Sequence, residues 1–166
     1  PYYNKSNEEG IYQHFSYVLD RVEVPCILYN IPGRTGCSIS ERNVQRLAVH
    51  PNAWGIKEAS GDISYATRVA RYLSDDFTMW SGNDDMIVPL LSLGASGVIS
   101  VWSNLDPKMV HDLVAAWHRG EVSLARELQL QYLDLVHALF CEVNPIPVKA
   151  ALARMGLMEE NYRLPL

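Results

Sequence analysis

The sequence lacks several features that would point to particular classes of protein. No apolar run approaches the roughly 20 residues that a membrane-spanning helix needs, and no secretory signal pattern opens the chain. Basic residues are not in excess, since 14 Lys and Arg stand against 19 Asp and Glu and the net charge is −5. No basic stripe favours nucleic acid. We therefore expect a soluble, cytoplasmic globular protein that binds neither membranes nor nucleic acid.

Cysteine is also scarce. The three cysteines, Cys26, Cys37 and Cys141, are an odd number, and no two of them have CxxC spacing. This pattern disfavours both a disulfide framework and a structural zinc site. We expect all three thiols to stay reduced, with Cys26 buried in a strand.

What the sequence does contain is a repeated alternation of strands and helices. Its 166 residues are 48% hydrophobic, enough for a substantial core. Strands are expected to begin near positions 26, 54, 78 and 97, the last covering 97–103, and a helix follows each. Later residues are all helical, with one long helix over 121–141 and another within 144–156. The apolar strands predict an α/β fold with a parallel sheet buried on both faces, either doubly wound or half of a (β/α)8 barrel.

Capping signals set the expected helix starts. Ser40 and the pair Asp106-Pro107 each precede a helical stripe. Within the segment SGNDD, Asp84 or Asp85 is expected to cap a helix that runs to Leu93. SGNDD follows a strand but has no Walker or Rossmann fingerprint, so capping is favoured over a phosphate or metal site.

Lys57, in the stretch GIKEAS (55–60), is the first candidate for chemistry. Burial in a strand favours the neutral amine, which is a nucleophile toward carbonyl groups. The alternatives are a strand-end lysine that reaches solvent, or an ion pair with Glu58. Strand alternation places Glu58 on the opposite face, which disfavours the ion pair.

Tyr29 and Arg34 are the next candidates. Tyr29 lies in the strand CILYN and is either a proton relay or an ordinary aromatic wall. Arg34 follows that strand in PGRTG, where its donors suit a substrate carboxylate, unless it is a surface loop arginine. The adjacent pair Tyr2 and Tyr3 is expected to pack against a subunit interface or against the first helix.

Taken together, six segments resemble the dihydrodipicolinate synthase family in order and spacing. They are PYYNKSNEEGIYQHF, ILYNIPGRTG, GIKEASGD, SGNDD, GASGVISVWSN and NPIPVKAAL. Tyr29 and Lys57 also keep that family's separation. The resemblance implies a (β/α)8 barrel and a class I aldolase mechanism without metal or organic cofactor. It implies that pyruvate condenses with L-aspartate 4-semialdehyde to give 4-hydroxy-tetrahydrodipicolinate, in lysine and diaminopimelate biosynthesis.

The same resemblance implies the roles of the catalytic residues. Lys57 would form the imine with pyruvate. Tyr29 would belong to a proton-relay triad, and Tyr3 would be the tyrosine of that triad which reaches into the neighbouring subunit's site. The implied assembly is a homotetramer, built as a dimer of dimers.

Binding roles follow from the resemblance as well. Arg34 would hold the carboxylate of the aldehyde substrate. Ile99 would line the pyruvate pocket through its backbone, with Gly82 nearby in the preceding loop. Tyr2 would be part of an allosteric lysine pocket.

The resemblance further implies that the chain corresponds to the C-terminal part of the family's length. Residues 1–120 would supply barrel strands five to eight, residues 121–166 would form a C-terminal helical region, and the N-terminal half-barrel would be absent. That half carries the threonine pair of the relay, for which Thr35 and Thr67 lie in the wrong segments. The chain alone is therefore expected to be incomplete for activity and to self-associate.

Two other functions stay open at this point. Another Schiff-base enzyme of the same superfamily, an N-acetylneuraminate lyase or a 2-keto-3-deoxy-sugar-acid aldolase, would share Lys57 and Tyr29. Arg34 within GRTG favours the synthase, because the sugar-acid enzymes usually differ there. The remaining alternative is an inactive barrel fragment that only mediates assembly.

Overall fold

The computed structural model describes residues 4–166, which divide into two compact units. The first is formed by the chain up to Gly82 together with Pro89–Ile99, and the second by Asn83–Val88 together with Ser100–Leu166. Among residues 4–166, no helix is both long and apolar enough to cross a membrane.

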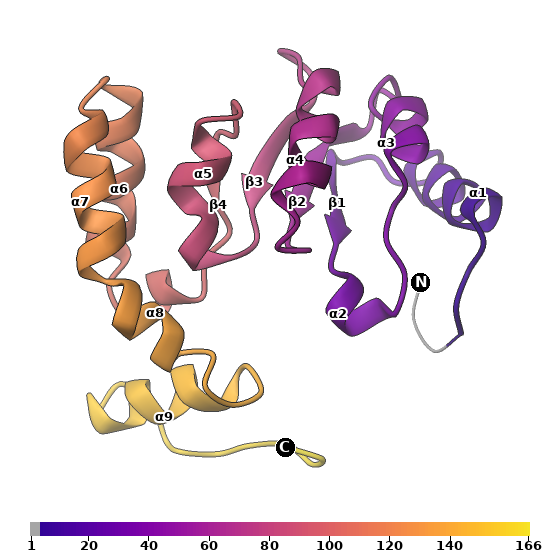
Figure 1. The fold of residues 1–166 in the computed structure, drawn as a ribbon. Coiled ribbons are helices and arrows are strands. Elements are labelled where there is room, and N and C mark those ends of the chain that lie inside the picture. The colour runs from indigo at the N-terminus through magenta and orange to yellow at the C-terminus, as the bar shows by residue number, and fades with distance from the viewer. Residues whose placement is uncertain (1–3) are drawn as a thin grey trace. The chain divides into compact units, whose positions relative to one another are not determined.

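The first unit holds a parallel sheet whose strands follow one another in sequence order (Figure 1). The strands are β1 (Cys26–Asn30), β2 (Ala53–Glu58), β3 (Thr78–Ser81) and β4 (Gly97–Val98). The strand starts expected from the sequence are confirmed to within one residue. The fourth strand is shorter than expected, because the segment after Val98 leaves the sheet.

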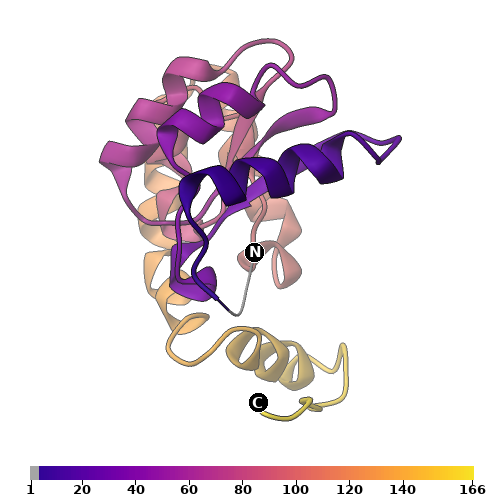
Figure 2. The same ribbon diagram turned by 90° about the vertical axis from the view of Figure 1, so that its right-hand side faces the viewer.

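In the first unit, helix α1 (Glu8–Leu19) precedes β1. The connections between the following strands contain α2 (Pro32–Thr35), α3 (Glu41–Leu47), α4 (Ile63–Val69) and the 3₁₀ turn η1 (Ala70–Tyr72). Helix α1 packs beside α3, and α3 beside α4; in Figure 2, α1 lies toward the viewer. Ser40 caps α3 as expected, since its hydroxyl accepts from the Asn43 amide at 3.1 Å. The PGRTG segment, expected as a loop, contains the short helix α2.

Only one face of the sheet is buried. Leu28, Ile56 and Met79 point to that face and are at most 2% exposed. On the other face, Ile27 and Tyr29 remain 36% and 42% exposed. The expectation of a sheet buried on both faces is therefore wrong. Apolar residues occupy both faces because side chains alternate along a strand, but the core lies against one of them.

An irregularity in β2 redirects one aromatic side chain. Cys26 pairs with Ala53 and Ile27 with Gly55, so Trp54 is an extra residue between two pairs. Such a bulge re-aims the side chain of the inserted residue. The Trp54 ring lies 5.3 Å from the ring of Trp80 on β3 and is half exposed.

The second unit is helical, with α6 (Pro107–His118), α7 (Val122–Gln131), α8 (Leu133–Ala138) and α9 (Ile146–Arg154), and the 3₁₀ turns η2 (Asp84–Met86) and η3 (Trp102–Asn104). Helices α6 and α7 pack side by side (Figure 1). Asp106 caps α6 as expected, accepting from the Met109 amide at 3.0 Å. The helix expected over 121–141 is interrupted at Tyr132, which separates α7 from α8.

Asp84 does not have the capping role expected of it. Its carboxylate Oδ2 accepts from the backbone amides of Val101 and Trp102, at 2.9 and 3.0 Å. No side-chain cap bond is made at the start of η2. Because those two amides bind a carboxylate, they do not extend the β4 ladder, and this explains the short fourth strand. Helix α5 (Ile87–Leu91) follows η2 and ends before Leu93.

All three cysteines are free thiols. Cys26 is half-buried, so the expectation that its strand would bury it is wrong; Cys37 is also half-buried and Cys141 is exposed. We predict that thiol titration of the denatured protein, performed without reductant, finds three reactive groups. A count of one would show that two of the cysteines pair and would contradict the structure.

Candidate active site

The candidate site centres on Lys57 and Tyr29, which are partners in the register of β1 and β2. Both side chains leave the less buried face of the sheet. The Lys57 Nζ lies 4.4 Å from the centroid of the Tyr29 ring. An amine and a phenol so close together near the carboxyl ends of parallel strands can carry out nucleophilic attack and proton transfer.

Glu58, the residue next to Lys57, points to the opposite face and is only 3% exposed. Its carboxylate is bonded to Asn30 and Ser60. This agrees with the sequence argument that strand alternation separates Glu58 from Lys57.

Gly82 leaves the space in which the Lys57 side chain lies. A Cβ at this position would be 2.5 Å from the Ala59 Cβ and 3.1 Å from Lys57 Cε. The Gly82 amide also donates to the Glu58 carbonyl at 2.7 Å, which holds this backbone against the end of β2. A side chain at position 82 would therefore displace Lys57 or its neighbours.

We predict that Gly82→Ala slows imine formation by about 10- to 100-fold, because displacing a reacting group by about 1 Å costs a factor of this size. Gly33→Ala is the matched control, since a Cβ at Gly33 meets no atom within 4 Å. The measurement is the rate at which borohydride traps a pyruvate adduct. An unchanged rate in Gly82→Ala would show that the space is not needed.

Arg34 lies in α2, directly after β1, and its side chain is exposed. Partial burial raises the pKa of the Tyr29 phenol above its usual value, and the positive charge of Arg34 opposes part of that rise. The phenol is thus protonated near neutral pH and able to donate. The Arg34 guanidinium offers hydrogen-bond donors to an anion.

Ile99 follows β4 and joins the same edge of the sheet. Its amide donates to the Ser81 carbonyl at 2.9 Å, next to Gly82. Its side chain is partly exposed. The structure therefore brings together Lys57, Tyr29 and Gly82, with Arg34 following the outer strand β1 and Ile99 following the outer strand β4. Tyr2 and Tyr3 lie outside the described residues.

Two residues near the site were missed by the sequence analysis, Asn30 and Glu58. Both are polar and almost fully buried, and they are hydrogen-bonded to each other. A signal existed, since each is a polar residue that directly follows a candidate residue in an apolar strand. Glu58 was considered only as a partner for Lys57.

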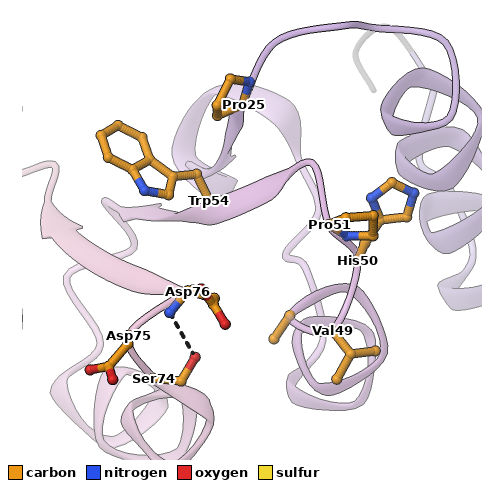
Figure 3. A pocket seen from close by; sticks show the side chains of 9 residues that line it. Pro25, Val49, His50, Pro51, Trp54, Ser74, Asp75 and Asp76 are labelled. Carbon is orange, nitrogen blue, oxygen red and sulfur yellow. Dashed lines mark hydrogen bonds between the residues drawn. The ribbon is translucent and has the colours of Figure 1, made fainter.

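A separate hollow of about 540 Å³ lies at the amino ends of the strands, opposite the candidate site (Figure 3). Pro25, Pro51 and Asp76 line it, and each of these residues precedes a strand. Sites in parallel α/β proteins form at the carboxyl ends of strands, whereas this hollow is at the amino ends. It contains none of the candidate residues.

The fold and the site together define an α/β protein whose parallel strands present a lysine, a tyrosine and an arginine toward their carboxyl ends. The model of the dihydrodipicolinate synthetase family matches residues 1–166. The chain belongs to that family.

Individual relatives support the assignment over the whole chain. The 4-hydroxy-tetrahydrodipicolinate synthase of Acetivibrio thermocellus is 48% identical across all 166 residues, which cover 56% of that relative. The crystal structure of dihydrodipicolinate synthase from Thermotoga maritima superimposes with a TM-score of 0.97 at 45% identity, over 100% of this chain and 58% of that one. The chloride-inhibited enzyme from Acinetobacter baumannii, complexed with pyruvate, gives 0.95 at 43% identity, over 100% and 57%. The chain thus spans somewhat more than half the length of these relatives.

Proposed function

We propose that the natural polypeptide carrying this chain condenses pyruvate with L-aspartate 4-semialdehyde through a Schiff base on Lys57. The observation that carries the proposal is the 4.4 Å approach of the Lys57 amine to the Tyr29 ring. Further support comes from the family assignment and from the relative that is complexed with pyruvate. The product is 4-hydroxy-tetrahydrodipicolinate, an intermediate toward diaminopimelate and lysine.

In the first half of the reaction, the neutral Lys57 amine attacks the ketone carbon of pyruvate. Protonation of the resulting hydroxyl lets it leave as water, and the imine forms. Loss of a proton from the methyl carbon then gives the enamine, with the imine nitrogen as electron sink. Tyr29, protonated near neutral pH, is placed to donate and recover protons in these steps.

In the second half, the enamine carbon attacks the aldehyde carbon of the second substrate, and the new alkoxide takes up a proton. The substrate's own amino group then adds to the imine carbon and displaces Lys57, which closes the ring and frees the enzyme. Arg34 holds the carboxylate of the semialdehyde, and Gly82 and Ile99 border the pyruvate.

In this proposal, the chain supplies strands five to eight of a (β/α)8 barrel in residues 1–120 and a C-terminal helical region in residues 121–166. Support comes from the four consecutive parallel strands and from the sheet face that stays partly exposed. A barrel uses such a face as its interior. Tyr3 would complete the relay across the interface of a homotetramer, and Tyr2 would border a lysine-binding pocket.

The test is a coupled synthase assay on the natural polypeptide, together with borohydride trapping of pyruvate. Turnover with aspartate semialdehyde, and none with N-acetylneuraminate or 2-keto-3-deoxy-sugar acids, is the expected result. Trapping without turnover of the semialdehyde would instead assign the protein to a sister aldolase. Absence of trapping would overturn the Schiff-base mechanism.

A further inference from the structure

Directly behind the candidate site, the reverse face of the sheet carries a buried polar pair, Asn30 and Glu58. They follow Tyr29 and Lys57 in β1 and β2, so they point away from the reacting groups. Asn30 is 1% exposed and Glu58 is 3% exposed. The Asn30 Nδ2 donates to Glu58 Oε2 at 2.7 Å.

Hydrogen bonds hold the Glu58 carboxylate from two sides. Its Oε1 accepts from the Ser60 amide at 2.7 Å and from the Ser60 hydroxyl, while Oε2 accepts from Asn30. Burial raises the pKa of Glu58, and the hydrogen bonds from Ser60 and Asn30 oppose that rise. The carboxylate is thus fixed in place by both strands and by the turn after β2.

The side-chain amide of Asn30 also holds the far end of the segment Ile31–Ile39. Asn30 Oδ1 accepts from the Ile39 backbone amide at 3.0 Å, and the Ile39 carbonyl accepts from the Tyr65 hydroxyl at 2.7 Å. One side chain therefore ties the far end of the segment back to its beginning. Arg34 lies inside this segment, in α2.

The pair is not needed to hold β1 and β2 together. Their backbones already form a parallel ladder from Ile27–Gly55 to Asn30–Glu58. A buried carboxylate loses hydration free energy, and an apolar pair of similar size would often stabilise the two strands as much or more. What the pair adds is the constraint on the Arg34 segment.

We propose that Asn30 and Glu58 are positioning residues that fix the Arg34 segment relative to Lys57. They would determine how well the carboxylate of the second substrate is held while the imine forms normally. The inference rests on the proposed function, in which Lys57 forms the imine and Arg34 binds the substrate carboxylate.

Asn30→Ala in the natural polypeptide tests the proposal. We expect the KM for aspartate semialdehyde to rise by about 10-fold, because a displaced Arg34 would hold the substrate carboxylate less well. The kcat and the rate of pyruvate trapping should stay close to wild type. Glu58→Gln keeps the side-chain volume and one oxygen that can still accept from Asn30, so it should raise the same KM less. It serves as the second variant if Asn30→Ala does not fold.

Asn52→Ala is the matched control. Asn52 lies just before β2, and its side-chain Nδ2 donates to the carbonyls of Leu19 and Val22, both at 2.9 Å. Its loss removes a comparable structural amide near the amino ends of the strands. We expect a similar drop in melting temperature and an unchanged KM. Loss of trapping and of stability in parallel in both variants would mean that Asn30 is merely structural.

A double-mutant cycle supplies the decisive readout. If Asn30 acts through Arg34, then adding Asn30→Ala to Arg34→Ala should raise the KM no further. Additive effects on the KM, or a wild-type KM in Asn30→Ala, would show that Asn30 does not position the Arg34 segment. A wild-type protein that does not trap pyruvate would instead overturn the proposed function, so the two failures are distinguishable.

Discussion

Lys57→Ala is expected to abolish the borohydride-trapped pyruvate adduct and to lower turnover by on the order of 10³-fold or more, as losing a covalent nucleophile does. In the proposed mechanism, Lys57 is the one protein group that bonds covalently to pyruvate, so its loss removes the imine itself. The measurement is intact mass after treatment with pyruvate and borohydride. Wild-type protein should gain one reduced pyruvate per chain, and the variant none.

Lys149→Ala is a close control for this experiment. The Lys149 Nζ also lies near a tyrosine ring, 5.2 Å from the centroid of Tyr162, but in the second unit. The proposed mechanism gives Lys149 no role, so Lys149→Ala should label like wild type. Equal labelling of Lys57→Ala and wild type would show that another lysine carries the imine.

Arg34→Ala is expected to reduce kcat/KM for aspartate semialdehyde while sparing the imine with pyruvate. Losing a charge-assisted pair with the substrate carboxylate should cost about 2–4 kcal/mol of transition-state binding. The checks are steady-state kinetics in the semialdehyde and, separately, the trapping rate with pyruvate alone.

Arg21→Ala provides the comparison for Arg34. The Arg21 guanidinium lies 3.5 Å from the centroid of the Tyr17 ring, so it too is an arginine beside a tyrosine in the first unit. It precedes β1, on the amino-terminal side of the strand and away from the carboxyl ends, so its loss should leave both measurements unchanged. If Arg34→Ala loses trapping and turnover equally, Arg34 is structural or serves pyruvate.

Local sequence signals predicted the strands and several helix starts well. The strand beginning at Cys26 and the caps Ser40 and Asp106 are local features, and the structure has all three. The length of the fourth strand could not be predicted this way. It depends on the Asp84 carboxylate, which is 17 residues from Val101 in sequence and takes its amide.

The burial of the sheet shows a different limit of the sequence. Ile27 and Tyr29 are apolar or aromatic like Leu28 between them, yet of these three side chains Leu28 alone is buried. Apolar side chains allow a face of the sheet to be buried, but tertiary packing determines whether that face is buried. For the same reason, the sequence could not show that Asn30 and Glu58 face the core as a bonded pair.

The register pairs Tyr29 with Lys57 and Asn30 with Glu58, and this back-to-back arrangement has a consequence for how the gene can change. Unless a bulge like the one at Trp54 absorbs it, a codon inserted into or deleted from either strand would rotate every later side chain of that strand to the other face. Glu58 would then point to the face that Lys57 and Tyr29 now share, and Lys57 would point to the buried face. A substitution changes one side chain, but a shift of register within the strand exchanges the faces of Lys57 and Glu58 at once. Natural variation in length should therefore avoid 26–30 and 53–58.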